Sequence, residues 1–418
     1  MLRVTFYYLC NNMKTFEIPE FYKSPILARV KDWRTAQDPK KKDFSPTLLD
    51  FGPVRFLMAR HFGFCYGVQN AIELSFRAVK ENPGRRIFLL SQMIHNPEVN
   101  ANLQEQGVSF LMDTYGNTIT PFDKLTKEDV VIIPAFGTTL DIKNELSNRG
   151  IEIHSYDTTC PFVHRVWNKA EKLGADKYSV IIHGRPYHEE TRATFSHSAA
   201  ESPSLIVKDM KETILLGDYI LGKLNREQFT EAFKDRYSAS FNPELSLEKI
   251  GVINQTTMLA EETQGIADYL KNIMVQKYGA DKIKEHFADT RDTLCYATNE
   301  NQDATHQLLK QHADIAIVVG GYNSSNTSHI VELCEQKFTT FFVTSAKEIE
   351  SADTIHHFDI HTEKRKTTLN FLPDKTPVTI VLTSGASCPD SMVEDVLMKL
   401  LSYYKETKKV EEVMEMFN

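Results

Sequence analysis

The sequence predicts an α/β protein of three units with parallel sheets, arranged as a trefoil about a pseudo-threefold axis. Two observations support this prediction. A plan of strand, loop with a single cysteine and amphipathic helix occurs three times, and each copy continues with further strands that end in polar residues. Strands that alternate with helices favour parallel sheets, whose ligands gather beyond the carboxyl ends of the strands.

Each copy begins with a strand and a cysteine. In the first copy an alternating run at 54–58 precedes Cys65, and apolar residues then recur at helical spacing. In the second copy Cys160 follows an expected short strand, and Pro161 stands where the first turn of a helix tolerates proline. In the third copy Cys295 precedes a weaker apolar stripe. The sequence therefore predicts one helix directly after each cysteine.

The later strands of each copy also end in equivalent positions. His95 lies 30 residues after the first cysteine, His188 lies 28 after the second, and Ser324 lies 29 after the third. A third strand then leads through a hydroxyl-rich turn into a helix, and these turns contain Thr256 and Ser387. Because the amino ends of helices bind anions, the copies together predict an anion site where they meet.

These repeats divide the chain into three units, with an arm before them and a tail after them. We expect the arm to wrap the surface or to be partly disordered, and the second unit to contain an inserted helix pair. The expected boundaries are 1–52 for the N-terminal extension, 53–66 for a strand that joins the third unit, 67–159 for the first unit, 160–291 for the second unit with its insertion at 195–248, 292–402 for the third unit and 403–418 for the C-terminal tail.

The composition is that of an ordinary globular protein. Of the 418 residues, 41% are hydrophobic and 25% are charged, and the formal net charge is -8. This charge gives no basic field for nucleic acid, and the longest apolar runs are too short to cross a bilayer. The first residues do not look like a transit peptide. We therefore expect a cytoplasmic protein with no nucleic acid and no membrane as partner.

The three equivalent cysteines indicate a metal cluster. Thiolates bind iron-sulfur clusters, and three of them suit a 4Fe-4S cluster in which one iron lacks a protein thiolate. A lone intracellular cysteine is more often a small buried hydrophobe, but the equivalent placement of Cys65, Cys160 and Cys295 favours the cluster. The other cysteines are expected to be structural: Cys10, Cys334 and Cys388. The last of them adjoins Ser387 and stays a spare candidate.

The polar residues at the strand ends are the donors that a diphosphate would require. They are His95, His188, Ser324, Ser325, Asn326 and Ser387. Helix capping is the plain alternative, because Ser, Thr and Asn are preferred there regardless of function. Glu190, beside Glu189, could act as a general acid if burial raises its pKa, and Thr256 could orient it. A solvated acidic turn and a helix cap would explain these residues equally well.

The ordered motifs of the chain resemble those of the 4-hydroxy-3-methylbut-2-enyl diphosphate reductase family, in its plant and cyanobacterial branch. The motifs are FGFCYGV, HNPEV, DTTCPFV, HGRPYHEET, NQTT, TLCYAT, NSSN and SGAS. The resemblance runs from about Val54 to Leu400. It implies a trefoil of α/β domains around one 4Fe-4S cluster per chain, with Cys65, Cys160 and Cys295 as the ligands.

The resemblance also implies an activity and roles for the polar residues. Glu190 falls on the family's proton donor and Thr256 on the threonine that helps organise the substrate hydroxyl. The residues that fall on the diphosphate site are His95, His188, Ser324, Ser325, Asn326 and Ser387. The implied reaction is reductive dehydroxylation of a small allylic diphosphate, (E)-4-hydroxy-3-methylbut-2-enyl diphosphate, to isopentenyl and dimethylallyl diphosphates, the last step of the non-mevalonate isoprenoid pathway.

The source of electrons is expected to be another protein. The chain has no P-loop, and GGYNSSN lacks the GxGxxG dinucleotide fingerprint, so a bound nicotinamide is not expected. We expect an external electron donor such as ferredoxin or flavodoxin.

One position departs from the family pattern. Many bacterial members carry a diphosphate-contacting histidine in an SAHG motif, whereas this chain has PAFG with Phe136. One anion contact is therefore missing or replaced.

Two other classes of protein stay open at this point. One is a non-catalytic iron-sulfur or zinc protein that senses redox state or metal, and the other is a cluster-dependent dehydratase that acts on a hydroxy acid. Cluster type and diphosphate binding would distinguish the first class, and dependence on a reductant would distinguish the second.

Overall fold

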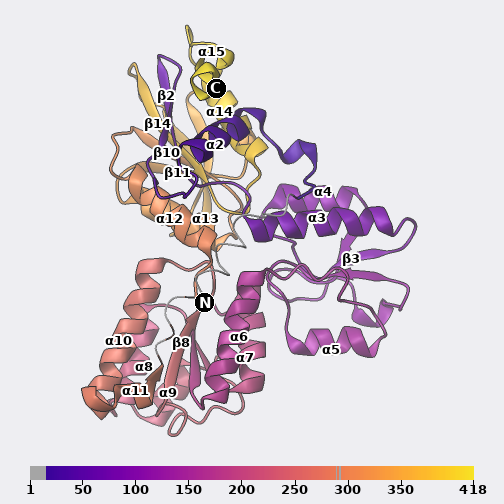
Figure 1. Cartoon of the computed structure of the whole chain (residues 1–418), viewed down its shortest axis with the longest axis vertical. Coiled ribbons are helices and arrows are strands. Elements are labelled where there is room, and N and C mark those ends of the chain that lie inside the picture. The colour runs from indigo at the N-terminus through magenta and orange to yellow at the C-terminus, as the bar shows by residue number, and fades with distance from the viewer. Residues whose placement is uncertain (1–15, 289, 291–292) are drawn as a thin grey trace.

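The computed structural model describes residues 16–288, 290 and 293–418, and these form three lobes around a common centre (Figure 1). Each lobe contains a sheet with parallel strands and helices packed against it. The predicted α/β class with parallel sheets is therefore confirmed. The expectation for Cys10 lies outside the described residues.

The first lobe contains a three-stranded parallel sheet in the order β4-β3-β5. Its elements are α3 (Tyr66–Glu81), β3 (Ile87–Leu89), α4 (Pro97–Glu105), β4 (Val108–Phe110), η2 (Phe122–Lys124), β5 (Val130–Ile132) and α5 (Leu140–Asn148). Val130 and Ile132 belong to one hydrophobic cluster and Val131 belongs to another. The sheet is thus buried on both faces, as parallel sheets usually are.

The second lobe contains a four-stranded parallel sheet in the order β7-β6-β8-β9. Its elements are α6 (Pro161–Ala175), β6 (Ser179–His183), α7 (Glu189–Glu201), β7 (Ser204–Val207), α8 (Met210–Ile220), α9 (Arg226–Ala232), β8 (Ile250–Asn254), α10 (Ala260–Tyr278), η3 (Ala280–Lys282), α11 (Ile283–His286) and β9 (Phe287–Ala288). The expected insertion contains the helix pair α8 and α9, and it also contains the edge strand β7.

The prediction of a short strand before Cys160 is wrong. Within residues 151–160 the only pairing is an isolated bridge between Asp157 and Ile133. Ile151 and Ile153 are both buried against the first lobe, so their alternation reflects packing. The chain then turns at 154–156, which prevents the segment from extending the sheet.

The third lobe contains a five-stranded sheet in the order β1-β2-β14-β10-β11, parallel except for β1. Its strands are β1 (Thr47–Asp50), β2 (Val54–Met58), β10 (Ile315–Val319), β11 (Thr339–Val343) and β14 (Val378–Ser384), with a hairpin of β12 (Thr354–Asp359) and β13 (Lys364–Leu369). Its helices are α12 (Tyr296–Leu308), α13 (Ser325–Glu335), η4 (Ala346–Glu348) and α14 (Asp390–Leu401).

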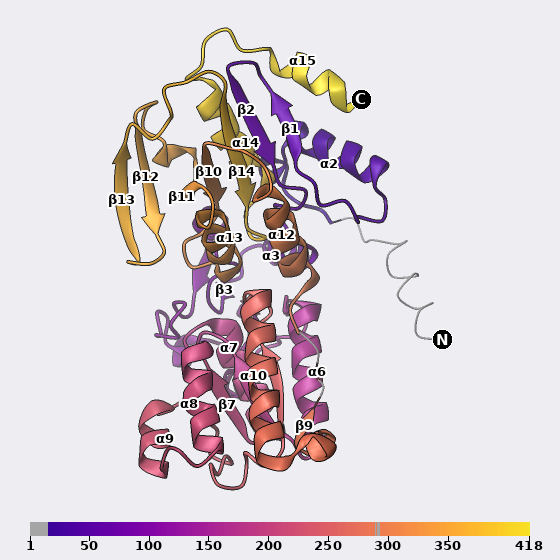
Figure 2. The same ribbon diagram turned by 90° about the vertical axis from the view of Figure 1, so that its left-hand side faces the viewer.

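The described parts of the expected arm and tail pack onto two lobes: Tyr22 belongs to the core of the first lobe, and the later arm and the tail pack onto the third. They contribute η1 (Glu20–Tyr22), α2 (Pro25–Gln37), α15 (Val410–Met414) and η5 (Glu415–Phe417), and Figure 2 shows α2 and α15 beside the sheet. Leu27, Val30 and Phe417 belong to the core of this lobe, and β1 pairs with β2. The described arm therefore joins the first lobe at Tyr22 and the third lobe from α2 onward. The boundaries between the units stay predictions.

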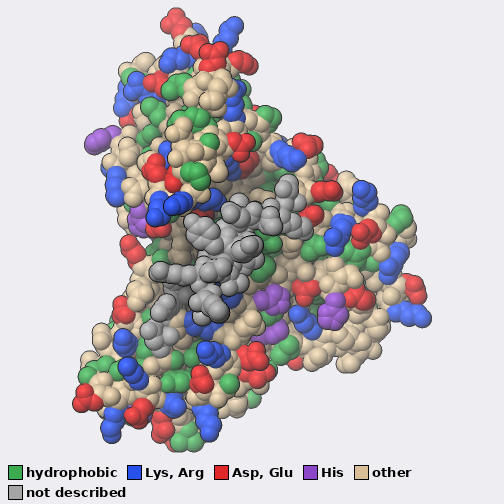
Figure 3. All heavy atoms as spheres, in the orientation of Figure 1, with side chains coloured by type: hydrophobic (Ala, Val, Ile, Leu, Met, Phe, Trp, Pro, Cys, Tyr) green, Lys and Arg blue, Asp and Glu red, His purple; other side chains and the backbone are tan. Residues whose placement is uncertain are grey.

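Two further observations concern the helices and the surface. No helix in the described part of the chain is long and apolar enough to cross a membrane. On the face shown in Figure 3, acidic and basic side chains are interspersed over all three lobes.

Candidate active site

Each of the three equivalent cysteines stands directly before the first turn of a helix. Cys65, Cys160 and Cys295 are the N-cap residues of α3, α6 and α12, and each has an extended backbone. The prediction of one helix after each cysteine is thereby confirmed. The amino end of each helix, with its partial positive charge, thus lies at a cysteine, where it would stabilise a thiolate.

The backbone of each cysteine is held by an equivalent hydrogen bond. Its N–H donates to a carbonyl oxygen in the turn that follows β14, β5 or β8. The pairs and their N–O distances are Cys65–Ala386 (3.2 Å), Cys160–Ala135 (3.0 Å) and Cys295–Thr256 (3.1 Å). The repeat found in the sequence is therefore also a repeat of backbone contacts. Each cysteine is bound to a turn at the sheet of one lobe and begins the first helix of another lobe.

The three thiols face a common space. A Cβ atom on Gly67 would lie 2.6 Å from the Sγ atom of Cys160, so only glycine permits this approach between α3 and α6. Burial raises the pKa of the Cys160 thiol, and the charges of Cys65 and Cys295 raise it further. All three are free thiols. Their chemistry and convergence fit the donor set of an iron-sulfur cluster.

The other described cysteines lie elsewhere. Cys334 and Cys388 are fully buried in the hydrophobic core of the third lobe. Cys388 follows Ser387 in the chain, but its side chain belongs to the core. Its placement gives no support for a role as spare ligand.

The two predicted histidines meet at the junction of the first and second lobes. Their Nε2 atoms lie 3.1 Å apart. His95 comes directly before Asn96, which caps α4, and His188 caps α7. Burial lowers the pKa of His95 to about 3 and holds that of His188 well below its usual value, so both imidazoles are neutral near pH 7.

Phe136 packs against both histidines. Its ring stacks on His95 with a centroid distance of 4.4 Å and meets His188 edge-on at 5.5 Å. The aromatic ring at this position therefore covers the histidine pair with carbon atoms and offers no hydrogen bond.

The third lobe brings its polar residues to the same junction. The Ser387 hydroxyl donates to the His95 carbonyl oxygen and lies the same 3.4 Å from the Ser324 hydroxyl. Ser325 accepts from the amide of Gln255, at 3.2 Å. The Asn326 Oδ1 accepts from the Ala386 N–H at 2.9 Å, and its Nδ2 has no partner among the described residues.

Glu190 and Thr256 form a buried pair on the second lobe. The Thr256 N–H donates to one carboxylate oxygen at 2.5 Å, and the Thr256 hydroxyl donates to the other at 3.0 Å. Burial raises the pKa of Glu190 to about 7, although both hydrogen bonds lower it. The charge of Glu190 in turn raises the pKa of Cys160 and Cys295, so the pair lies beside the cysteines.

The site also contains Glu189, to which the sequence assigned no role. Only 7% of Glu189 and 2% of Glu190 are exposed, so the alternative of a solvated acidic turn is wrong for both. The Oε2 atom of Glu189 lies 3.5 Å from the Nε2 atom of His95. Its place at the first position of α7, directly after the capping His188, is the signal that could have pointed to it.

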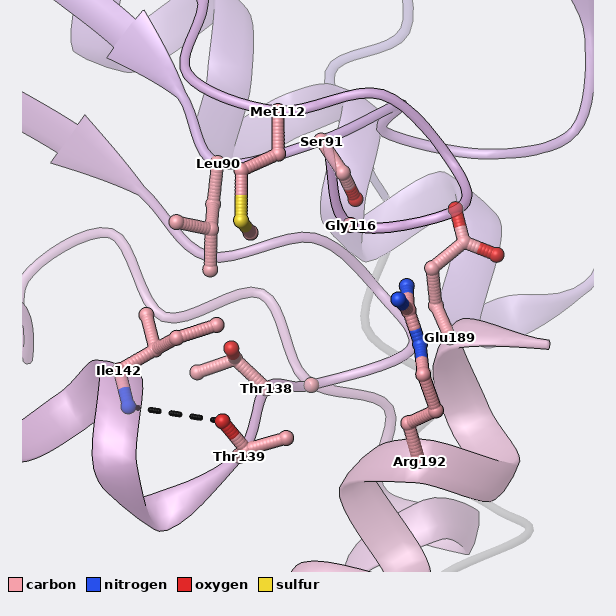
Figure 4. A pocket seen from close by; sticks show the side chains of 10 residues that line it. Leu90, Ser91, Met112, Gly116, Thr138, Thr139, Ile142, Glu189 and Arg192 are labelled. Atoms are coloured by element: carbon pink, nitrogen blue, oxygen red, sulfur yellow. Dashed lines mark hydrogen bonds between the residues drawn. The ribbon is translucent and has the colours of Figure 1, made fainter. Parts of the chain in front are cut away.

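A cavity of about 130 Å³ lies behind Glu189, at the contact between the first and second lobes (Figure 4). Glu189 and Arg192 project from α7 on one side, and Leu90, Met112 and Thr138 line the other. The cysteines and the histidine pair do not line it, so it adjoins the site without containing it.

Fold and site together define a class: three-lobed α/β proteins in which every junction between lobes brings one cysteine to a common site. The chain belongs to the LytB protein family, whose pattern it matches over residues 56–401.

Curated relatives extend over most of the chain. It is 40% identical over 359 residues to the 4-hydroxy-3-methylbut-2-enyl diphosphate reductase of Synechococcus sp. (strain WH7803), covering 86% of this chain and 88% of the relative. The protein of the same name from Prochlorococcus marinus (strain NATL1A) is 36% identical over 392 residues, covering 93% of this chain and 92% of the relative.

Two solved structures share the fold. The E-1-hydroxy-2-methyl-but-2-enyl-4-diphosphate reductase from Plasmodium falciparum aligns with a TM-score of 0.59 at 20% identity, covering 87% of this chain and 98% of that one. A structure described as (E)-4-hydroxy-3-methyl-but-2-enyl diphosphate reductase, the terminal enzyme of the non-mevalonate pathway, aligns with a TM-score of 0.50 at 21% identity, covering 83% of this chain and 99% of that one.

Proposed function

We propose that the chain catalyses reductive dehydroxylation of (E)-4-hydroxy-3-methylbut-2-enyl diphosphate to isopentenyl and dimethylallyl diphosphates, the last step of the non-mevalonate isoprenoid pathway. The reductase names of the curated relatives support this reaction. The observation that carries the proposal is the convergence of three equivalent cysteines beside the Glu190–Thr256 pair and the two histidines. A protein that only stores or senses a metal would not require this buried acid.

In this proposal one 4Fe-4S cluster per chain is bound by Cys65, Cys160 and Cys295. The fit is supported by the three free thiols and by Gly67, which leaves room for the sulfur of Cys160. Such a cluster supplies electrons at low potential and an iron without a protein thiolate. The protein contributes the arrangement of the substrate around it.

The diphosphate end of the substrate would be held where the lobes meet. The N–H of Glu190 donates to the Nδ1 atom of His188 at 3.1 Å, so the proton of this neutral imidazole is on Nε2 and is available to an anion. The Nδ2 atom of Asn326 is free to donate to the same ligand. The remaining donors would be His95, Ser324, Ser325 and Ser387.

The hydroxyl end of the substrate would lie against Glu190. The reaction breaks one C–O bond, consumes two electrons and two protons, and releases water. With a pKa of about 7, Glu190 is partly protonated near neutral pH and can deliver one proton to the departing hydroxyl group. Thr256 fixes both carboxyl oxygens and thus holds this proton at a defined place.

The electrons would come from an external donor such as ferredoxin or flavodoxin. The lack of a dinucleotide fingerprint in the sequence supports this part of the proposal.

The test is anaerobic turnover of the substrate by cluster-loaded protein, with and without chemically reduced viologen. We expect viologen oxidation and both five-carbon diphosphates, and no reaction of the corresponding alcohol without its diphosphate. Conversion without a reductant would indicate a dehydratase. No conversion by protein that carries its full cluster would indicate a sensor, and either result would overturn the proposal.

A further inference from the structure

On the side of the first lobe, the side chain beside the histidine pair offers a bound diphosphate no hydrogen-bond donor. The turn after β5 presents the ring of Phe136, which covers His95 at 4.4 Å and has no polar atom. On this side of the histidine pair, the described contacts of the first lobe thus include one side chain with a nitrogen or oxygen atom, that of His95 itself. A diphosphate bound here would face carbon atoms on that side.

Glu189 brings a carboxyl group to the same place from the opposite lobe. A carboxylate oxygen of Glu189 and ring nitrogens of His95 and His188 all lie within 4.8 Å of one another, and Oε2 is 3.5 Å from the Nε2 atom of His95. The other oxygen, Oε1, is buried and has no hydrogen-bond partner in the described part of the chain. A buried oxygen without a partner is costly unless a ligand satisfies it.

The proton positions show which atoms can donate. His188 carries its proton on Nε2, because its Nδ1 accepts from the backbone of Glu190. In the empty site this N–H points at the Nε2 atom of His95, 3.1 Å away. The two ring nitrogens and the carboxyl group of Glu189 thus lie together, and an anion bound here would replace the contact between the two rings.

The geometry points to Glu189 as a further donor to the diphosphate: its carboxyl group is protonated in the complex and donates its O–H to a phosphate oxygen, where Phe136 offers no polar atom. This inference rests on the proposed function, because it requires that a diphosphate binds at the histidine pair. It makes Glu189 a binding residue with a task different from that of Glu190.

The charges around Glu189 are compatible with this protonation. Burial raises its pKa to about 7, a hydrogen bond from its own backbone N–H and the charge of Arg192 lower it, and the charge of Asp113 raises it. The titratable or charged groups that face the cluster are His95 from the loop after β3, Asp113 from the loop after β4, Arg185 from the loop after β6, and His188, Glu190 and Arg192 from α7. A bound diphosphate adds negative charge and therefore raises the pKa of Glu189 further.

Binding of the diphosphate must then be coupled to the uptake of a proton by Glu189. Above pH 7 the empty site loses the proton of Glu189, whereas the complex keeps it, so the Kd rises with pH by up to about tenfold per unit. Glu189→Gln keeps an N–H donor of similar shape and has no proton to lose. Its Kd should therefore lack this part of the pH dependence.

The experiment is calorimetric titration of the cluster-loaded protein with inorganic pyrophosphate, under anaerobic conditions, from pH 6.5 to 8.5 and in two buffers of different ionisation enthalpy. Wild type is compared with Glu189→Gln, and Glu201→Gln at the exposed end of the same helix is the matched control. The ionisation of pyrophosphate itself cancels in each comparison.

At pH 8 we expect wild type and Glu201→Gln each to take up about one more proton per pyrophosphate than Glu189→Gln. The ratio of the wild-type Kd to the Glu189→Gln Kd should grow by up to about tenfold per pH unit. Equal proton uptake in all three proteins, or a Glu189→Gln protein that binds more weakly at every pH, would overturn the inference. If Glu189→Gln does not fold, Glu189→Ala takes its place in the same comparison with wild type and Glu201→Gln, and equal proton uptake would again overturn the inference. A wild type that binds no pyrophosphate would instead contradict the proposed function.

Discussion

Glu189 and Glu190 are neighbours in the chain, yet they lie in two different parts of the site. Both are buried in the first turn of α7, and burial raises the pKa of each to about 7. Glu190 accepts two hydrogen bonds from Thr256 beside the cysteines. Glu189 lies beside the histidine pair, with one oxygen that has no partner among the described residues.

This difference follows from helix geometry and from what each carboxyl group contacts. Consecutive residues of an α-helix point about 100° apart, so one turn can place two acids in two subsites. A carboxyl group with two fixed donors is held in place, which suits transfer of a proton at a defined atom. A carboxyl group with a free oxygen is suited to contact a ligand.

The largest expected effect comes from removing the proposed cluster ligand beside Glu190. Cys160→Ala takes away one of three thiolates, so we expect loss of the cluster and of measurable turnover. Iron and sulfide per chain and the visible absorbance check this. Cys334→Ala, in the core of the third lobe, is the matched control and should keep the cluster. A full iron content in Cys160→Ala would contradict the ligand assignment.

A smaller effect is expected from loosening the pair that holds Glu190. The hydroxyl of Thr256 donates to the carboxylate and so lowers the pKa of Glu190. Thr256→Val removes this donor, so the pKa should rise, and the alkaline limb of the pH-rate profile should move to higher pH. We expect kcat to fall by about tenfold and Thr256→Ser to restore most of it. An unmoved alkaline limb would show that Glu190 is not the acid that limits the rate.

The smallest effect is expected on the side of Glu189. Phe136→His places an imidazole beside His95, where the ring of Phe136 now stacks. One added hydrogen bond is worth about 1 kcal/mol, so pyrophosphate should bind roughly fivefold more tightly. Its Kd at pH 6.5 checks this. Unchanged or weaker binding would mean that this side of the histidine pair does not face the anion.

Much of this architecture could be predicted from local patterns. The run at 54–58 is β2, the run IAIVV is β10, and each of the three cysteines caps a helix. These elements have strong periodicity or a marked start, and both are local properties of the sequence. The equivalent spacing from each cysteine to His95, His188 and Ser324 then indicated which loops would meet.

The rest depends on contacts between distant segments. An acidic pair at the start of a helix has the same sequence whether it faces solvent or a neighbouring lobe, so the burial of Glu189 could not be predicted. The stacking of Phe136 on His95 likewise joins residues from two loops. The short strand expected before Cys160 is absent because buried isoleucines at alternate positions need not pair with a sheet.

The most direct test of the central claim is the anaerobic turnover of Glu190→Gln against wild type, with reduced viologen and with equal cluster content shown for both. If Glu190 delivers the proton to the departing hydroxyl, kcat should fall by about 10²- to 10⁴-fold while pyrophosphate still binds. A Glu190→Gln protein that turns over at the wild-type rate would contradict the proposed role of this carboxyl group.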